Sequence, residues 1–283
     1  MTRLPLSHFQ ESVLILEAGR SEKNYWTDLW RYRELFIILA WRDISVRYKQ
    51  TIIGILWAIL RPFLTMIVFT IIFGRIARLP SDGNVPYALM VFAAMLPWSL
   101  FSNALSESSN SLIGNANLIG KVYFPRIIIP MATLVTAFID FIISFIILIG
   151  IMVYYQFMPG WQIILLPIFM VLALLASLGP GLWIAALNVK YRDFRYIIPF
   201  VVQFGLYISP VAFSSKVIPE QWRLLYSLNP AVGVIDGFRW CILGTESAIY
   251  SPGFFLSLAM IAFFLFLGLF YFRKTEKAFA DII

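Results

Sequence analysis

Long apolar runs separated by short polar segments fill most of this chain. A helix that crosses a bilayer needs about 20 mostly apolar residues, and six runs meet or approach that length. Two of them, with 17 residues each, are at the short limit. The pattern predicts an all-α integral membrane protein with six transmembrane helices, in which a cytoplasmic tail (residues 1–51) precedes a transmembrane domain (residues 52–283). The predicted spans are Ile52–Phe73, Val85–Phe101, Ile127–Tyr155, Trp161–Leu187, Ile197–Phe213 and Phe254–Phe272.

The composition agrees with a membrane protein rather than a soluble domain. Hydrophobic residues make up 60% of the chain, charged residues only 13%, and the mean hydropathy is +0.83. Cys241 is the one cysteine, so an intrachain disulfide and a metal–thiolate cluster are both excluded. No nucleotide-binding or catalytic motif is visible. We therefore expect a protein that acts within or across the bilayer and takes any chemical energy from another chain.

The positive charges lie unevenly around the predicted spans. The net charge is +7, and with the N-terminus inside, sixteen Lys and Arg residues fall on the cytoplasmic side and five on the outer side. Arg61 lies within the first span. An excess of inner positive charge is the usual bias of membrane proteins, and it predicts that both termini are cytoplasmic. The alternative, a basic tail that binds nucleic acid, does not explain this distribution.

The tail contains a helix pattern but no cleavable signal peptide, since its apolar run Leu35–Trp41 is too short to span. Residues Asp28–Lys49 interleave aromatic and charged side chains, a composition that suits the headgroup layer. Arg33 and Arg47 fall off the main polar face. We predict an interfacial helix on the inner membrane surface, and an ordinary solvated helix is the alternative.

Two short inner loops are candidates for contact with a soluble partner. Asn115–Val122 can form two helical turns. Pro125 then ends the helix, because the residue before a proline avoids the helical region. A short helix at the inner face suits docking, and a solvated connector is the alternative. The second inner loop, Asn188–Arg195, is equally compact and carries Asp193 among three basic residues.

The outer segment between the fifth and sixth spans is only half polar. Ile218–Leu228 and Val232–Leu243 are too short to cross the membrane, and Asn229-Pro230 separates them. We predict an outer re-entrant pair of half-helices that dips into the membrane and returns. Irregular backbone survives at that depth only where protein or a water-filled cavity covers it. The pair is therefore expected to line a path.

Four ionisable groups lie in apolar segments, where a charge costs roughly 2.5–3.5 kcal/mol at the bilayer centre on insertion scales. Arg61 and Asp140 lie in the first and third spans. Arg61 either faces the bundle interior or reaches back to the inner surface. For Asp140, a structural role and a role in conformational coupling both stay open. Asp236 and Arg239, in the second half-helix, are candidates for an internal ion pair or a gate.

Aromatic residues are abundant, with 26 Phe, 13 Tyr and 9 Trp. Many suit the interfacial belt, but several lie well inside the predicted spans. An aromatic face can pack against the C–H face of a sugar, so a path lined by such rings would suit a sliding glycan. Packing in the core or against lipid is the alternative for each ring. The residues that we expect at a substrate path are Arg61, Trp57, Trp98, Phe101 and Tyr207.

Four ordered segments resemble the permease subunits of ABC-2 type exporters that move lipid-linked polysaccharides: O-antigen, capsule and teichoic acid. They are RYKQTIIGILWAILRPF (Arg47–Phe63), NANLIGKVYFPRIIIPMATLVTAFIDF (Asn115–Phe141), YRDFRYIIPFVVQFGLYISPVAF (Tyr191–Phe213) and LNPAVGVIDGFRWCIL (Leu228–Leu243). The resemblance covers every region except the N-terminal tail, the first outer loop and the last span. Four ordered and spaced matches are specific for this family.

The resemblance implies a homodimer in the bacterial cytoplasmic (inner) membrane, with two copies of a cytoplasmic ABC ATPase that bind ATP and Mg²⁺. The permease chain itself then carries no cofactor, no metal and no catalytic residue. Closure of the ATPase dimer would push the inner loops and tilt the two permeases, which opens a path between them. The residues expected to contact the ATPase are Asn115, Asn117, Leu118, Lys121, Tyr191, Arg192 and Asp193.

The implied substrate is a polysaccharide on an undecaprenyl diphosphate anchor, with O-antigen as the first choice. Arg61 and the basic inner rim would attract the diphosphate, because arginine suits phosphate oxygens. The half-helices within Ile218–Leu243 resemble the family's outer re-entrant gate, and Asp28–Lys49 resembles its interface helix. Membrane lipid and the ATPase are the other expected partners.

Other functions stay open at this point. Within transport, the alternatives are a capsule or teichoic acid exporter of the same family and an ABC-2 permease for a smaller lipid or drug. An integral membrane transferase acting on lipid-linked sugars would need clustered carboxylates or histidines, whereas the acidic residues here are scattered over both faces. An ion-driven secondary transporter would need a chain of titratable groups, and none is visible.

Overall fold

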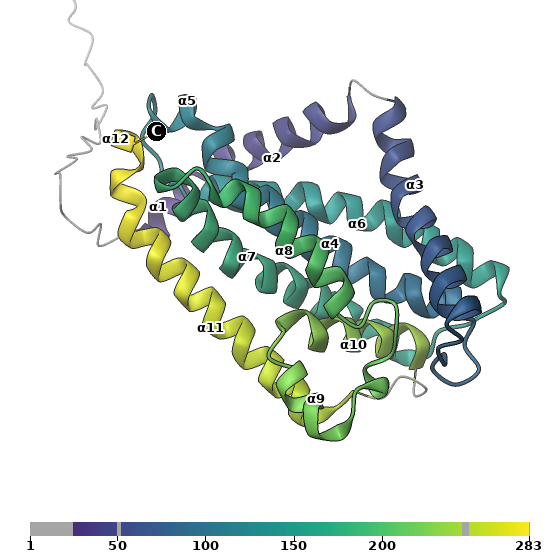
Figure 1. Cartoon of the computed structure of the whole chain (residues 1–283). Coiled ribbons are helices and arrows are strands. Elements are labelled where there is room, and N and C mark those ends of the chain that lie inside the picture. Colours follow the sequence, from purple (N-terminus) through teal and green to yellow (C-terminus); the bar gives the residue numbers. More distant parts are fainter. Residues whose placement is uncertain (1–24, 50–51, 245–248, 283) are drawn as a thin grey trace, which may run out of the picture.

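Helices make up every regular element in the part of the chain that the structure describes, residues 25–49, 52–244 and 249–282. The structure is a computed structural model, and within these ranges nothing is described for the side chains at positions 26, 52–55, 57, 58, 280 and 281. The long helices pack alongside one another, and short helices lie at the two ends of the bundle (Figure 1). In chain order the elements are α1 (Tyr25–Arg31), α2 (Arg33–Tyr48), α3 (Ile52–Phe69), the π-helix η1 (Thr70–Ile76), α4 (Tyr87–Gly114), α5 (Ala116–Ile119), α6 (Ile128–Tyr154), η2 (Trp161–Leu165), α7 (Leu166–Lys190), α8 (Phe194–Ile208), η3 (Ser215–Val217), α9 (Glu220–Tyr226), α10 (Pro230–Leu243), α11 (Ser251–Thr275), η5 (Glu276–Ala278) and α12 (Phe279–Ile282).

Five helical segments in the described ranges are long and apolar enough to cross a membrane. They correspond to the first, second, third, fourth and sixth predicted spans, so the prediction of an all-α, multi-pass membrane protein is confirmed. The helix at the fifth span, α8, has 15 residues, which is about 22 Å at 1.5 Å per residue against about 30 Å of hydrocarbon. A sixth crossing stays a prediction. The five segments are Ile59–Ile76, Tyr87–Gly114, Ile128–Tyr154, Trp161–Lys190 and Ser251–Ala278.

α8 ends before the predicted limit at Phe213, because Pro210 follows it. Ser209, the residue before this proline, has φ −78° and ψ 154°, an extended conformation. The chain then turns without regular helix until η3 begins at Ser215. In a membrane protein, an irregular segment of this kind needs protein partners for its backbone carbonyls.

α4 is the central helix of the bundle. In its apolar 18-residue stretch, 83% of the residues are buried inside the chain. In the corresponding stretch of α3 and η1 the share is 11%. The predicted second span ended at Phe101, but the helix continues through the polar stretch to Gly114. The polar side chains there bond back to their own helix; for example, the Ser108 hydroxyl donates to the Ala104 carbonyl at 2.6 Å. Packing against α7 then overrides the low helix propensity of the serines and asparagines.

Close helix crossings depend on glycine. α7 and α11 cross at Gly179 and Gly268, and a Cβ atom on Gly179 would lie 2.6 Å from the backbone of Phe264. α8 meets α4 at Gly205, where a Cβ atom would lie 2.5 Å from the ring of Trp98. Small residues of this kind let helices approach closely in a membrane. They set how near the neighbouring helices can lie.

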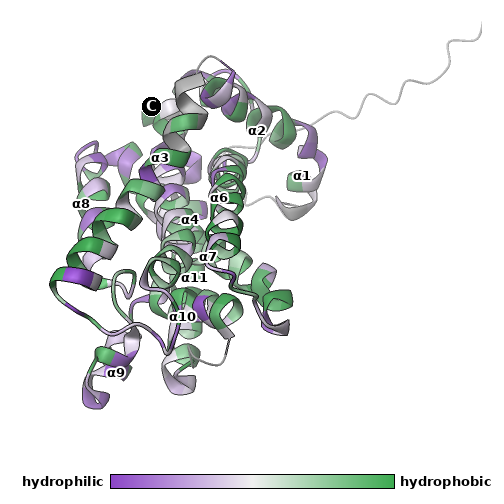
Figure 2. Cartoon of the chain, turned by 90° about the vertical axis from the view of Figure 1, so that its right-hand side faces the viewer, coloured by the Kyte–Doolittle hydropathy of each residue, from purple (hydrophilic) through white to green (hydrophobic). Residues whose placement is uncertain are grey.

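Three long helices leave most of their apolar surface uncovered within the single chain. In the apolar stretches of α3 and α11, only a minor share of the residues is buried inside the chain. Ile198 is the one buried residue among those described for α8. Figure 2 shows hydrophobic residues along α3, α6 and α8, with hydrophilic residues gathered toward the two ends of the bundle. Large exposed apolar surfaces face lipid or another protein chain.

The structure divides the predicted interfacial helix Asp28–Lys49 at Tyr32, into α1 and α2. α2 packs against α6 and buries Leu39 and Ala40. Its exposed side carries large apolar groups such as Trp41, which is 69% exposed. An aromatic outer side suits the membrane interface, and that location stays a prediction, as does the domain division at residue 52. The first 24 residues of the predicted tail lie outside the described ranges.

Candidate functional site

The short helix α5 follows α4, at the same end of the bundle as the C-terminal α12 (Figure 1). Its first turn starts at Asn115, whose carbonyl accepts from the N–H of Ile119 at 3.1 Å. Ile119 is buried and anchors the helix, Leu118 is half-buried, and Asn117 and Lys121 are exposed. The predicted docking residues are thus on the surface of the chain, and their contact with an ATPase stays a prediction.

The second predicted docking loop is a turn between α7 and α8. Tyr191, Arg192 and Asp193 are all exposed there. The ends of α7 and α4 are adjacent, since the side-chain amide of Asn188 donates to the Ser109 carbonyl at 2.8 Å. This turn therefore lies at the same end of the bundle as α5, and both loops are available to one partner.

Asp140, the carboxylate in the third predicted span, belongs to a polar cluster that joins α2, α4 and α6. Arg47 of α2 donates to Glu107 of α4, and its other terminal nitrogen lies 2.6 Å from Asp140 of α6. Tyr48 donates to Asp140 as well. The Asp140 side chain is 8% exposed and that of Arg47 is 37% exposed. We call these four residues, Arg47, Tyr48, Glu107 and Asp140, the inner ion cluster.

The inner ion cluster has one arginine for two carboxylates. Removing one partner of a buried ion pair leaves an uncompensated charge, which costs more than the pair contributes. Burial and the hydrogen bond to Asp140 raise the pKa of Tyr48 above its usual range, so the Tyr48 hydroxyl keeps its proton and donates. Any movement of α2 away from the bundle separates Arg47 from at least one carboxylate.

α2 also touches the start of the α5 turn. A terminal nitrogen of Arg42 lies 2.7 Å from the side-chain oxygen of Asn115, and the same distance from Asp43. Arg42 and Arg47 are on the same helix. α2 therefore connects the predicted docking helix with a buried carboxylate in α6.

Arg47 and Glu107 were missed as site residues by the sequence analysis. A signal for Arg47 was present, because its position off the polar face of the helix turns a cation toward the bundle. Glu107 lies in the polar stretch after Phe101, beyond the end of the predicted second span. Once that stretch is helical, Glu107 comes to lie one helical turn from Asn103, whose amide is 3.5 Å from Asp140.

At the opposite end of the bundle, side chains bind the irregular backbone that follows α8. Arg239 of α10 is 0% exposed, and it donates to the carbonyls of Val211 at 3.0 Å and Phe213 at 2.8 Å. Tyr87 of α4 donates to the carbonyl of Ala212 between them. These hydrogen bonds satisfy three backbone carbonyls, which lipid acyl chains would leave without a donor.

Two carboxylates lie beside this segment. Asp82, in the first outer loop, accepts from Ser214 at 2.8 Å and lies 3.6 Å from the ammonium of Lys216. Asp236 of α10 accepts from Ser215 at 2.6 Å. The outer polar network, as we name it, consists of Asp82, Tyr87, Asp236 and Arg239.

The predicted option of an internal ion pair between Asp236 and Arg239 is not realised. Among the described residues, no ion pair within 4.0 Å joins them; Asp236 binds Ser215 and Arg239 binds backbone carbonyls. The reason is the break after α8, which leaves carbonyls without helical partners, and a guanidinium has enough donors to serve several of them. A role of these residues as a gate stays a prediction.

The predicted half-helices correspond to α9 and α10, and the break between them includes Asn229, as the Asn-Pro signal indicated. The Asn229 side chain accepts from the N–H of Ala231 at 3.0 Å, and Pro230 is the first residue of α10. The two helices differ in environment: most of α10 is buried, whereas each described residue of α9 is at least partly exposed. Insertion of this pair into the membrane stays a prediction.

The candidate path residues fall into two groups. Arg61 of α3 and Tyr207 of α8 are exposed, and the Arg61 guanidinium has no hydrogen bond or ion pair with any described residue. Trp98 is 6% exposed, and its ring lies 5.5 Å from that of Phe101, so within one chain these two rings pack in the core. The side chain of Trp57 lies outside the described part. The path itself stays a prediction.

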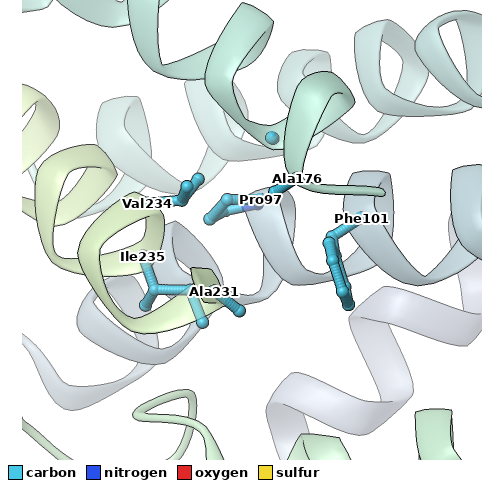
Figure 3. Close-up of a pocket in the computed structure, with 7 residues that line it drawn as sticks. Pro97, Phe101, Ala176, Ala231, Val234 and Ile235 are labelled. Carbon is cyan, nitrogen blue, oxygen red and sulfur yellow. The ribbon is translucent and has the colours of Figure 1, made fainter. Parts of the chain in front are cut away.

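Phe101 and Pro97 of α4 also border a narrow gap against α7 and α10 (Figure 3). The gap is lined by small or aliphatic side chains such as Ala231 and Val234, and it has no room for a water molecule. It is a packing gap rather than a route for substrate. In the described residues there is likewise no group of three or more His, Cys, Asp or Glu side chains able to hold a metal ion.

The long apolar helices and the polar clusters at both ends of the bundle define a multi-pass helical membrane protein. The chain belongs to the ABC-2 type transporter family, whose profile matches residues 34–243. The match begins in α2 and ends at the last residue of α10, so it includes both the inner ion cluster and the outer polar network. The prediction of a transport protein rather than an enzyme is confirmed.

Curated relatives are similar over most of their length. The O-antigen export system permease protein RfbA of Klebsiella pneumoniae is 26% identical over 260 residues, which cover 88% of this chain and 95% of the relative. The RfbA protein of Myxococcus xanthus is 27% identical over 215 residues, 75% of this chain and 81% of the relative. The inner membrane transport permease YadH of Escherichia coli K12 is 25% identical over 217 residues, 72% of this chain and 83% of the relative.

Proposed function

We propose that this chain is the membrane-spanning subunit of an ATP-driven exporter that moves a lipid-linked polysaccharide, most specifically O-antigen, across the bacterial cytoplasmic membrane. The alignment with an O-antigen export permease over 88% of this chain and 95% of the relative supports the substrate class. Two copies of the chain pair in the membrane. Two copies of a cytoplasmic ATPase bind ATP and Mg²⁺, and both permease termini lie on that side.

The position of Arg61 is the observation that carries the proposed path. Arg61 lies in a candidate span, but it is exposed and has no ion pair or hydrogen bond through its guanidinium with any described residue. An ionisable side chain in a span normally faces a protein interior or a water-filled cavity. A path between two copies, bordered by α3 and by Tyr207 of α8, supplies that environment. The guanidinium would then bind the diphosphate of an undecaprenyl anchor.

The coupling path that we propose runs from α5 through α2 to α3. The ATPase contacts Asn117, Leu118 and Lys121 on and beside α5, and the turn Tyr191–Asp193 next to it. The contact between Arg42 and Asn115 passes a displacement of α5 to α2. α2 is followed directly by α3, which carries Arg61. The inner ion cluster holds α2 against the bundle, and we propose that breaking it releases α2 into a second position, which would be the two-state element that a coupling path requires.

The test is the ATPase rate of the purified permease–ATPase complex in lipid, with and without a lipid-linked glycan. We expect hydrolysis only in the complex and a change of rate on addition of the glycan. A rate that responds to a small lipid or drug but not to the glycan would overturn the substrate class and keep the exporter. A chain that forms no stable complex with any ATPase would overturn the exporter itself.

A further inference from the structure

An apolar cavity of about 280 Å³ lies between α4, α7 and α8. Its walls include Leu105 of α4, Trp183 and Leu187 of α7, and Phe194 and Ile197 of α8, and all of the lining surface is apolar. The volume is close to the lower end of the range for ligand pockets, about 300–1,000 Å³. Neither the candidate path nor the coupling contacts account for this space.

The cavity follows from the way α8 packs. Near its C-terminal end, α8 touches α4 so closely that a Cβ atom on Gly205 would lie 2.5 Å from the Trp98 ring. The lining residues of α8 come from its first turns, Phe194 to Val201. α8 is therefore in close contact with the bundle near its C-terminal end, and its first turns pack less closely, with Ile198 as their buried residue. The cavity lies at the end next to the α7–α8 turn.

Hydrocarbon is the material that fits this space. Trp183 and Leu187 belong to the candidate span Trp161–Lys190, so the cavity lies at membrane depth. Apolar walls offer water no hydrogen-bond partners, and wall atoms without neighbours lose dispersion contacts. An acyl chain from the surrounding bilayer restores those contacts.

The adjacent turn is positively charged. Lys190, Arg192 and Arg195 flank the cavity walls along the chain, and all three are exposed. Asp193 is the carboxylate among them, and in the described part of the chain no ion pair within 4.0 Å neutralises any of the three cations. Two of the cations instead lie 5.1 Å from tyrosine rings, Lys190 over Tyr191 and Arg195 over Tyr196. Such donors suit phosphate oxygens.

We propose that this cavity is a binding site for an anionic phospholipid. One acyl chain occupies the space between α4, α7 and α8, and the headgroup phosphate binds Lys190 and Arg195, which flank the turn that we propose contacts the ATPase. The site is separate from the proposed path at Arg61. It depends only on the membrane location of the bundle, so it stands or falls independently of the exported substrate.

Fluorescence quenching by brominated acyl chains tests the site through Trp183. The full-length chain is placed in nanodiscs that contain, at equal mole fraction, brominated phosphatidylglycerol or brominated phosphatidylcholine. The contribution of Trp183 is the difference between the wild type and Trp183→Phe. We expect severalfold stronger quenching of Trp183 by the anionic lipid. Trp161, which is 68% exposed and begins η2 just before α7, serves as the control through Trp161→Phe and should show no headgroup preference.

Charge and volume variants separate the two halves of the site. Lys190→Gln with Arg195→Gln should abolish the headgroup preference at Trp183, whereas Lys121→Gln with Lys274→Gln, which removes the same charge elsewhere, should retain it. Ile197→Phe fills the cavity and should reduce quenching by both lipids. Equal quenching by the two lipids, or none by either, would overturn the proposal. Displacement of the brominated lipid by a trace of polyprenyl phosphate would also overturn it, by assigning the cavity to a polyprenyl carrier.

Discussion

The two polar regions of this chain use arginine in opposite ways. In the inner ion cluster, Arg47 is 37% exposed and binds side chains of two other helices. In the outer polar network, Arg239 is 0% exposed and binds backbone carbonyls of a broken segment. Separation of the inner contacts leaves the partly exposed Arg47 within reach of water, and the cost falls mainly on Asp140, whose side chain is 8% exposed. Separation of the outer contacts leaves carbonyls buried without partners. The first arrangement suits movement and the second suits rigidity.

The largest expected effect is on stability, at Arg239. Arg239→Met keeps the apolar volume of the side chain but leaves the carbonyls of Val211 and Phe213 without donors. Each buried carbonyl left without a donor costs about 1–3 kcal/mol, so we expect a large drop in the thermal unfolding midpoint of the purified protein. Arg223→Met is the matched control: Arg223 also binds carbonyls, those of Lys216 and Ile218, but at the partly exposed α9. Equal loss in both variants would contradict the comparison.

The next effect concerns coupling at Arg47. Arg47→Gln removes the cation that faces both Glu107 and Asp140, so α2 loses its ionic attachment to the bundle. We expect glycan-dependent stimulation of the partner ATPase to fall roughly 5- to 150-fold, the factor that corresponds to typical coupling free energies between sites. The unfolding midpoint should fall less than in Arg239→Met. Lys49→Gln, on an exposed residue just after α2, should leave the stimulation unchanged. Full stimulation in Arg47→Gln would remove the inner ion cluster from the coupling path.

A double-mutant cycle sharpens this result. Arg47→Gln and Glu107→Gln act on the same contact, so their combined cost should be smaller than the sum of the two single costs. For residues in one ionic network the difference is about 0.5–3 kcal/mol, measured by chemical or thermal unfolding. A second cycle of Arg47→Gln with Arg223→Met, at opposite ends of the bundle, should be additive. Additive behaviour in the first cycle would show that Arg47 and Glu107 do not interact.

The smallest expected effect on stability is at Arg61, which lacks the partners that both polar regions provide. Arg61→Gln should change the free energy of unfolding by no more than about 0.5 kcal/mol, as for other surface substitutions, yet it should lower glycan export. Arg75→Gln, at the exposed far end of the same helical segment, should affect neither. Export assayed in cells gives the answer, and normal export in Arg61→Gln would remove Arg61 from the substrate path.

Much of the helical pattern follows from local signals. The apolar runs gave five of the candidate spans, and Asn229-Pro230 marked the start of α10 because the asparagine caps it and the proline suits its first turn. The polar end of α4, residues 102–114, lies beyond the predicted second span and was not predicted to be helical. Serines and asparagines favour loops when exposed, whereas here the packing of α4 against α7 and bonds to the helix's own carbonyls keep the segment helical to Gly114.

The site was less predictable than the fold. Asp140, Asp236 and Arg239 were recognised because charged residues in apolar runs are costly and therefore conspicuous. Their partners were not recognised. Arg47, in an interfacial helix, and Glu107, in a polar stretch, were unremarkable as single residues, and they meet Asp140 only when three helices distant in the chain come together.

Hydropathy and charge placement were thus enough to establish a helical membrane protein, because the bilayer constrains the length and composition of each span independently of the others. The pairing of polar groups required the packed bundle. Which carboxylate faces Arg47, which carbonyls need Arg239, and where α8 leaves a cavity beside α7 all depend on distances between segments far apart in the chain. Those distances are set by close packing at residues such as Gly205 and Gly179, and no local pattern encodes them.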